Sequence, residues 1–211
     1  MGYLGYKPAD KPLTSADITD SIITSAKITD ATIVLADLSA TGTKDATTFL
    51  RGDNTFAVAG GKNTPAFHAR MSANQTISNN TLTKVVFDTE EFDTASAYDN
   101  ATNYRFTVPS GQAGKYFIYT SIQGKMQDAA SALQAVKVAI YKNGSQISIN
   151  GTDPRNNNGY FFTAYSYLTL SLVATDYIEI FGYIIGTSGT NTILNDSQTH
   201  TNSFGAFKII E

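Results

Sequence analysis

The sequence predicts an all-β protein whose C-terminal two thirds form a two-sheet sandwich. Three observations favour this fold class. Short segments with apolar side chains at every second position recur from about residue 66 to residue 210. Turn signals rich in Gly, Asn and Pro separate them, and Asn143-Gly144 is the strongest of these signals. Tyr and Phe, at 12 each, supply large apolar side chains in a chain without Trp.

Composition limits the classes of partner and chemistry. The 211 residues are 42% hydrophobic, which suffices for one substantial core. A net charge of −3 and the absence of a Lys/Arg cluster argue against nucleic acid and against insertion into, or binding to, an anionic membrane. The chain contains no Cys, so disulfides, thiol chemistry and Cys-based metal sites are excluded. No apolar run reaches membrane-spanning length and no signal-peptide core is present, which fits synthesis in a reducing cytoplasm.

Residues 1–12 are expected to form an N-terminal docking arm. Tyr3, Leu4 and Tyr6 are apolar side chains in a Gly- and Pro-containing segment without periodicity. Apolar side chains on a short arm suit an existing groove on another protein, and the alternative is a disordered terminus.

Residues 13–64 are expected to form a stem and linker built on a five-residue repeat. A step of five residues fits neither one stripe of a helix nor one face of a strand, so the chain is expected to turn about once per repeat, as in β-helical solenoids. So short a repeat cannot bury its own aliphatic row, and association with identical chains would cover it. The alternative is an amphipathic helix, which the many β-branched residues disfavour. The predicted stem core consists of Leu13, Ile18, Ile23, Ile28, Ile33 and Leu38.

The segment from Phe49 to Phe56, FLRGDNTF, is expected to turn at Arg51-Gly52-Asp53, with Gly52 allowing a positive φ and with Asp53 and Asn54 bonding nearby amides. The segment resembles a phrase common in phage tail-fibre and other virion proteins. The opening GYLGYKP and the repeat LTSADITDSIITSAKITDATI are likewise similar to phage virion proteins. Together these resemblances cover about the first 58 residues.

The head, residues 65–211, is expected to contain about ten short strands in a jelly-roll sandwich. The predicted strand segments are residues 66–71, 84–87 with Phe92 following before a polar turn, 104–106, 114–124, 136–141, 147–149, 165–172, 177–185 and 203–210.

The head resembles the globular domains of the C1q and tumour necrosis factor superfamily. That family's motif is matched at Phe87, Asp93, Tyr98, Gly114 and Tyr116, whereas Ile118 stands where the motif has Phe. The resemblance implies a C1q-like jelly roll and a homotrimer formed through one side of the sandwich, for which the apolar segment 177–185 is a candidate contact. The expected head core includes Phe87, Tyr98, Phe106, Tyr116 and Phe207.

Signals for catalysis are weak, and the chain is expected not to be an enzyme. His68 and His200 are the only histidines, and no Gly-x-Ser-x-Gly elbow is present. Asp88, Glu90, Glu91 and Asp93 form an acidic cluster, but alternate side chains of an extended segment diverge. A solvated edge is the preferred interpretation, with Ca²⁺ at a subunit interface as the alternative. No other metal or cofactor is expected.

Two function classes fit these observations. The preferred one is a bacteriophage virion structural protein, a short trimeric fibre or knob displayed on the particle surface for host attachment, with capsid decoration as a close alternative. The other is a bacterial C1q-like binding module outside any virion. The partners expected for the first class are identical chains, other virion proteins through the arm, and a host surface receptor.

Overall fold

The computed structural model describes residues 14, 16, 18–19, 21, 23–29, 34, 39–58, 63–126, 133–153, 161–187, 191–194 and 201–210. The chain divides into two compact units, Met1–Gly60 and Gly61–Glu211. Within the described ranges, no helix is long and apolar enough to cross a membrane.

The described part of the N-terminal unit consists of short elements. Ser25–Lys27 forms one turn of 3₁₀ helix, and β1 (Thr48–Leu50) pairs antiparallel with β2 (Phe56–Val58). In the turn between these strands Asn54 adopts a φ of 61°, so the prediction of a positive φ at Gly52 was wrong. Asn tolerates this conformation because its short polar side chain can bond locally.

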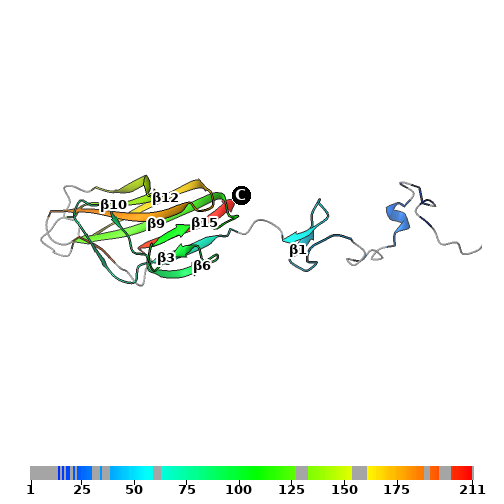
Figure 1. Ribbon diagram of the computed structural model, residues 1–211, viewed down its shortest axis with the longest axis horizontal. Coiled ribbons are helices and arrows are strands. Elements are labelled where there is room, and N and C mark those ends of the chain that lie inside the picture. The colour runs from blue at the N-terminus through cyan, green and yellow to red at the C-terminus, as the bar shows by residue number, and fades with distance from the viewer. Residues whose placement is uncertain are drawn as a thin grey trace, which may run out of the picture. The chain divides into compact units, whose positions relative to one another are not determined.

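Two antiparallel sheets form the C-terminal unit (Figure 1). The first sheet contains β3 (Ala66–Arg70), β4 (Gln75–Ile77), β6 (Thr89–Asp93), β9 (Gly114–Met126), β12 (Phe161–Leu172), β14 (Asn191–Ile193) and β15 (Ser203–Ile210). The second sheet contains β5 (Thr83–Lys84), β7 (Tyr98–Asp99), β8 (Arg105–Thr107), β10 (Leu133–Lys142), β11 (Ser145–Thr152) and β13 (Tyr177–Gly186).

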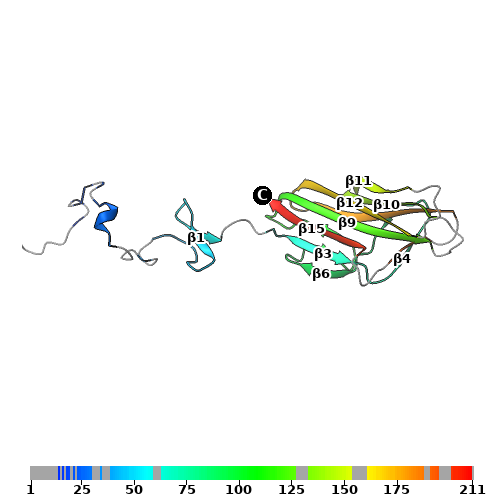
Figure 2. The same ribbon diagram turned by 180° about the vertical axis from the view of Figure 1, so that it is seen from behind.

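The first sheet is organised around the long strand β9. β12 pairs with β9 over its length, while β15 and then β14 pair with successive parts of its other edge. β3 and β6 continue the sheet beyond β15. Figure 2 shows β12, β9, β15, β3 and β6 side by side in this order. The second sheet runs β11-β10-β13-β8-β7, with β5 also paired to β13.

The chain crosses repeatedly between the two sheets, which is the jelly-roll arrangement. The path leads from β3 to β8, β9, β10, β12, β13 and β15, and each of these steps changes sheet. The hairpin between β10 and β11 stays within one sheet. The fold class predicted from the alternating segments is therefore confirmed for the head, although the described residues form more strands, β3 to β15, than the ten expected. Several predicted strands are longer than expected, and the additional ones, such as β4 and β14, are short.

Aromatic rings fill the space between the sheets. Phe67 stacks on Tyr98 at 4.6 Å between ring centres and on Phe106 at 5.1 Å, and it meets Phe204 edge to face at 4.8 Å. The Tyr98 hydroxyl donates to the Phe87 carbonyl oxygen at 2.8 Å, so this buried polar group is satisfied. Burial raises the pKa of Tyr98. Of the residues predicted for the core, Phe87, Tyr98, Phe106 and Tyr116 are buried.

The two ends of the sandwich differ in what they carry. At the terminal end, where β3 begins and β15 finishes, the Lys208 N–H donates to the Pro65 carbonyl oxygen at 3.0 Å. The opposite end, called the loop end here, is where β9 and β13 finish and where β12 begins. The polar loops that the sequence places after residues 71, 152 and 186 all leave the sheets at the loop end.

Candidate functional site: an aromatic face on the first sheet

The outer face of the first sheet carries aromatic side chains from neighbouring strands. Successive residues of a strand point to opposite faces, so inward Tyr116, Ile118 and Thr120 leave Phe117 and Tyr119 outward. The same alternation brings outward residues of the other strands onto this face. We call this surface the aromatic face; it consists of His68, Phe92, Phe117, Tyr119, Tyr165, Tyr167 and Phe207.

These rings contact one another across the strands. Phe117 lies 5.5 Å from Phe207, 6.1 Å from Tyr119 and 6.4 Å from Tyr167 between ring centres. His68 lies 6.3 Å from Phe92 and 5.9 Å from Tyr119. The aromatic face is therefore continuous from β12 to β6.

Gly205 allows Tyr119 to cross β15 and reach His68. Gly205 is the register partner of both residues, and a Cβ at this position would lie 2.3 Å from the Tyr119 ring. The Tyr119 hydroxyl and His68 Nδ1 share a hydrogen bond of 3.0 Å. Burial raises the pKa of Tyr119, so the phenol keeps its proton at neutral pH.

Much of the aromatic face is open to solvent in the single chain. Tyr167 is 70% exposed, Tyr165 is 59% exposed and Phe92 is 50% exposed. Contiguous exposed apolar surfaces are typical of sites where proteins bind a partner. Tyr combines a large rigid contact area with a hydroxyl that can find a polar partner, which suits a protein interface.

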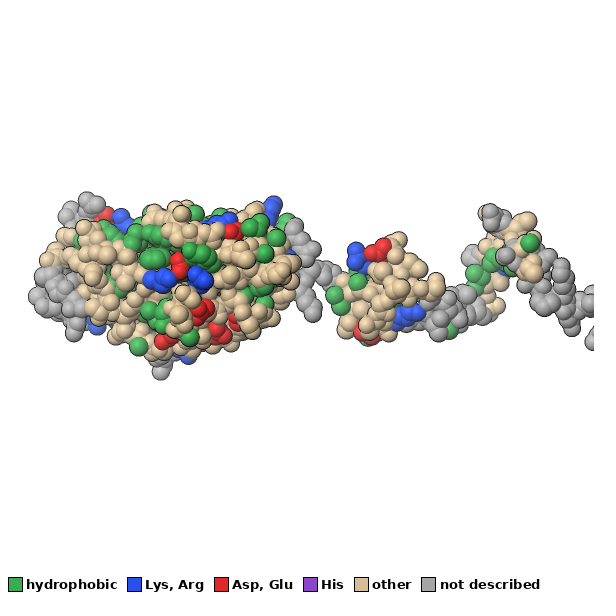
Figure 3. All heavy atoms as spheres, in the orientation of Figure 1, with side chains coloured by type: hydrophobic (Ala, Val, Ile, Leu, Met, Phe, Trp, Pro, Cys, Tyr) green, Lys and Arg blue, Asp and Glu red, His purple; other side chains and the backbone are tan. Residues whose placement is uncertain are grey.

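The outer face of the second sheet carries aromatic and charged side chains together. Three of its aromatic rings lie against cationic side chains, and Tyr141 lies 4.2 Å from Phe181 between ring centres. A mixture of hydrophobic, basic and acidic groups is visible on the view of the sandwich in Figure 3. The three cation–ring pairs are Arg105 with Tyr177 at 4.5 Å, Lys137 with Tyr183 at 5.7 Å, and Lys84 with Phe181 at 6.0 Å. Such pairs cover ring faces that would otherwise meet water.

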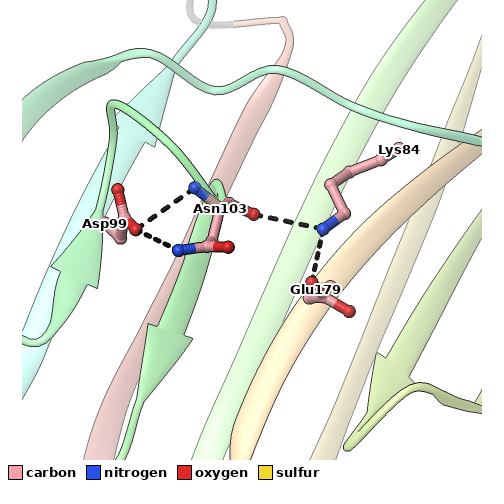
Figure 4. A network of polar contacts seen from close by, with 4 residues as sticks. All are labelled: Lys84, Asp99, Asn103 and Glu179. Carbon is pink, nitrogen blue, oxygen red and sulfur yellow. Dashed lines mark hydrogen bonds and ion pairs between the residues drawn. The ribbon is translucent and has the colours of Figure 1, made fainter.

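Ionic and hydrogen-bonded contacts hold one of these cations, Lys84, in place. Lys84 Nζ lies 2.5 Å from Glu179 Oε1 and 3.3 Å from the Asn103 carbonyl oxygen (Figure 4). Asp99 in turn accepts from the Asn103 side-chain amide at 2.6 Å. The segment 177–185, predicted as a candidate trimer contact, is thus the middle strand of a face on which cations lie beside the rings, whereas the aromatic face lies on the other sheet.

The acidic cluster divides into separate local contacts. Asp88 accepts from the Ser72 N–H at 2.7 Å, Asp93 accepts from the Tyr98 N–H at 2.7 Å, and Glu91 pairs with Arg70. Burial, and secondarily the charge of Asp93, raises the pKa of Glu90. In the part of the chain that the structure describes, no three His, Asp or Glu side chains gather as metal ligands would.

Phe207 was wrongly assigned to the head core. It is half-buried on the aromatic face, and Phe204 from the same strand occupies the core instead. The alternation along β15 places Phe204 and Ala206 inward, so Phe207 must point outward. The sequence analysis assigned no function to Phe117, Tyr119 or Tyr167. A signal was present, because aromatic residues at both odd and even positions of one strand indicate that both faces of that strand are apolar.

The predictions for the arm and stem are left as predictions. Tyr3, Leu4 and Tyr6 lie outside the described residues, as do Leu13, Ile33, Leu38 and His200. Ile18, Ile23 and Ile28 are described, and each is exposed in the single chain.

In the Arg51-Gly52-Asp53 turn, Asp53 Oδ1 accepts from the Thr55 hydroxyl at 2.6 Å and Arg51 lies 3.6 Å from Asp53, so this carboxylate has a local role in closing the hairpin.

Comparison with known proteins yields similarity of fold only. No protein-family model matches the chain, and no curated protein matches it. The globular domain of zebrafish complement 1qA is 13% identical with a TM-score of 0.48, covering 70% of this chain and 98% of that one.

Two further solved structures are similar to the same degree. Murine APRIL is 13% identical with a TM-score of 0.49, covering 68% of this chain and 98% of that one. The Eiger TNF of S. frugiperda is 13% identical with a TM-score of 0.46, covering 69% of this chain and 91% of that one. At so low an identity and TM-score nothing about activity follows, and the jelly roll rests on the strand pairing.

Proposed function

We propose that this protein is a non-enzymatic structural protein of a bacteriophage virion. In this proposal it forms a short homotrimeric fibre or knob that displays its C-terminal head on the particle surface for host attachment. The observation that carries the proposal is the exposed aromatic face, because a contiguous exposed apolar surface calls for a protein partner.

A second copy of the same chain is the partner that fits the aromatic face. β12 lies at the edge of the first sheet and presents Phe161, Tyr165 and Tyr167 there. An edge of one copy that packs on the face of the next makes a heterologous contact, and such contacts close into a ring when the rotation permits. A three-membered ring would cover the aromatic face of every copy and leave no apolar edge open.

The position of the chain entry on the head supports outward display of the loop end. The head joins the preceding chain at Pro65, beside Lys208 at the terminal end. A particle that holds the N-terminal arm would therefore present the opposite end outward. Loops on a rigid sandwich are common binding sites, and three copies would convert a weak contact into avidity.

The virion setting rests on the first 58 residues. The arm with Tyr3, Leu4 and Tyr6 offers an apolar peptide for a groove on the particle, and the FLRGDNTF segment resembles phage fibre proteins. The stem predicted for residues 13–64 is short for a long-range fibre, which favours capsid decoration as the second candidate role.

The test measures the mass of the full-length protein by light scattering during gel filtration at micromolar concentration. Wild type is expected as a trimer, and Tyr167→Asp is expected to weaken the trimer because it places a charge in the aromatic contact. Ile149→Asp, an exposed position on the other sheet, is the matched control and should leave the mass unchanged. A wild-type monomer would refute the assembly.

A further inference from the structure

Two Asn-Gly pairs lie at different places on the hairpin formed by β10 and β11. Asn143-Gly144 makes the turn between the strands, and Asn150-Gly151 lies near the end of β11, at the edge of the second sheet. A third pair, Asn158-Gly159, lies outside the described residues. An Asn side chain before Gly can react with the next backbone nitrogen, because Gly has no side chain to shield that nitrogen. The surroundings of each described pair therefore decide whether this reaction occurs.

The Asn150 side chain lies against the backbone nitrogen that would attack it. The Gly151 N–H donates to Asn150 Oδ1 at 2.9 Å, which brings this nitrogen close to Cγ of the same amide group. Both residues are exposed, so water reaches the amide from solvent. Thr152 ends β11 directly after this pair. The ends of edge strands open most readily, which gives the backbone the freedom to turn the Gly151 nitrogen onto Cγ.

The Asn143 side chain, in contrast, is held by the segment that precedes β13. Asn143 Nδ2 donates to Asp176 Oδ1 at 2.7 Å, and Asn143 Oδ1 accepts from the Tyr177 N–H at 2.8 Å. Asp176 is itself fixed by Lys142, whose Nζ lies 2.8 Å from Asp176 Oδ2. Attack on the Asn143 amide would first have to break both of its hydrogen bonds, one of which is made to a charged group. The turn therefore protects Asn143.

Close packing between β10 and β11 requires Gly at position 151. A Cβ there would lie 2.1 Å from the Val136 carbonyl oxygen and 2.6 Å from Lys137 Cα, both of which belong to the backbone of β10. A larger residue would shield the nitrogen, but it would also force the two strands apart. The unshielded nitrogen after Asn150 is thus a consequence of how closely these strands approach.

We propose that Asn150 is a site of spontaneous deamidation in the folded protein. The Gly151 nitrogen gives up its proton and forms a bond to Asn150 Cγ, the Cγ–Nδ2 bond breaks, and the side-chain nitrogen leaves with that proton as ammonia. Water then opens the resulting cyclic imide at either carbonyl carbon, which yields aspartate or isoaspartate. Water is the only co-reactant, and no group is oxidised or reduced.

The modification changes both the charge and the backbone of β11. Either product places a carboxylate at position 150, and isoaspartate also adds a methylene to the main chain. Asn150 pairs with Val138 and Gly151 pairs with Lys137, so the longer main chain would shift the last residues of β11 out of register with β10. The inference goes beyond the proposed virion role and does not rest on it, because β11 belongs to the sheet opposite the aromatic face.

The test incubates full-length protein at mildly alkaline pH and locates the products by fragment-ion mass spectrometry, with an unincubated sample as the baseline. The tryptic peptide of residues 143–155 contains both Asn143 and Asn150, so one spectrum compares the two sites. Asn150 is expected to react about tenfold faster than Asn143 or more, because two side-chain hydrogen bonds protect Asn143. Asn150→Gln is the matched control: it should abolish the product at position 150 and leave the slow reaction of Asn143 unchanged.

The same incubation in concentrated urea separates structure from sequence. The two pairs should then react at similar rates, because unfolding removes the contacts of Asn143 with Asp176 and Tyr177. A difference that persists in urea would mean that the flanking sequence sets the rates, which would overturn the structural explanation. Equal rates in the folded protein, or an Asn150 that reacts in urea and stays intact in the folded protein, would refute the site.

Discussion

At the scale of single residues, the alternation along β15 separates two phenylalanines with different roles. Phe204 is buried among the rings of Phe67, Phe87 and Tyr98, whereas Phe207 lies on the aromatic face. Phe204→Ala is expected to lower the free energy of unfolding of the head by about 3–5 kcal/mol, because it leaves a cavity. Phe207→Ala should lower it by roughly 1 kcal/mol or less, as is usual away from the core.

Urea unfolding of the two variants, followed by tyrosine fluorescence at several protein concentrations, separates the two effects. If the urea concentration at the unfolding midpoint depends on protein concentration, then assembly contributes to stability. The midpoint reached at the lowest protein concentrations reports the stability of the single head. Equal losses for Phe204→Ala and Phe207→Ala at that limit would contradict the placement of Phe207 on the outer face.

Asp99 makes the head sensitive to acid. Hydrogen bonds from the Thr102 N–H and, next, from the Asn103 side chain hold the pKa of Asp99 at about 2, below the usual value of about 3.9. A depressed pKa adds stability that is complete above the unfolded value and is lost as pH falls toward the folded value. Wild type should therefore lose more stability than Asp99→Asn between about pH 4 and pH 2.

Thermal unfolding followed by circular dichroism across that pH range measures the difference. The temperatures at which the two proteins unfold should approach each other as the pH falls toward 2, because the Asp99 carboxylate is then almost fully protonated in the unfolded chain and about half protonated in the folded chain. Parallel curves for wild type and Asp99→Asn would show that this carboxylate contributes nothing to acid sensitivity.

The sequence predicts which side chains are buried where apolar residues occupy only every second position of a strand. Inward positions such as Phe67 and Val138 follow from strict alternation. Phe207 could not be placed because Phe204, Ala206 and Phe207 supply apolar side chains at both parities of one strand, so the pattern alone does not fix which set faces the core. The hydrogen bond between Tyr119 and His68 joins residues 51 positions apart and depends on the strand order.

At the scale of elements, the stem provides a direct test of the five-residue repeat. Ile28→Asp is expected to disrupt the stem, because a charge among aliphatic side chains costs several kcal/mol and would recur in every subunit. The head should keep its stability because its core is separate. Limited proteolysis should then cut residues 13–58 faster than in wild type.

Thr29→Asp, one position outside the aliphatic row, is the matched control for this experiment. It adds the same charge to the same segment and should leave the protease resistance of the stem close to that of wild type. If Ile28→Asp behaves like this control, then the inward-facing row of the repeat is misassigned.

Elements with strong local signals could be predicted, and short ones could not. The Asn143-Gly144 hairpin forms as expected, with positive φ at both residues and strands β10 and β11 on either side. β4 and β14 each have only three residues; β4 pairs with β14, and β14 pairs with β9. A segment of three residues is too short to show a recognisable period of two in the sequence.

At the scale of the whole molecule, the decisive experiment removes the arm. Deletion of residues 2–12 is expected to leave the trimer intact and to abolish incorporation into particles, because assembly would use the aromatic face and the stem while docking uses the arm. Gel filtration measures the first outcome, and protein content of purified particles measures the second. Incorporation at the wild-type level would refute the docking role of Tyr3, Leu4 and Tyr6.

Particles that lack residues 65–211 separate attachment from decoration. If the head binds the host, then such particles should adsorb to cells more slowly than wild-type particles. Unchanged adsorption together with a lower thermal stability of the particle would instead favour the role in capsid decoration.

The pairing of β3 with β15 at the terminal end has a mechanical consequence. Hydrogen bonds in a sheet run perpendicular to its strands. A force that pulls Pro65 away from Ile210 would therefore open the β3–β15 pairs one after another, like a zipper. A force between Pro65 and the loop end runs along the strands, so many interstrand hydrogen bonds bear the force at the same time, in shear. A head tethered by its N-terminal side and gripped at its loop end would work in this stronger direction, and single-molecule pulling should show a higher rupture force there than between Pro65 and Ile210.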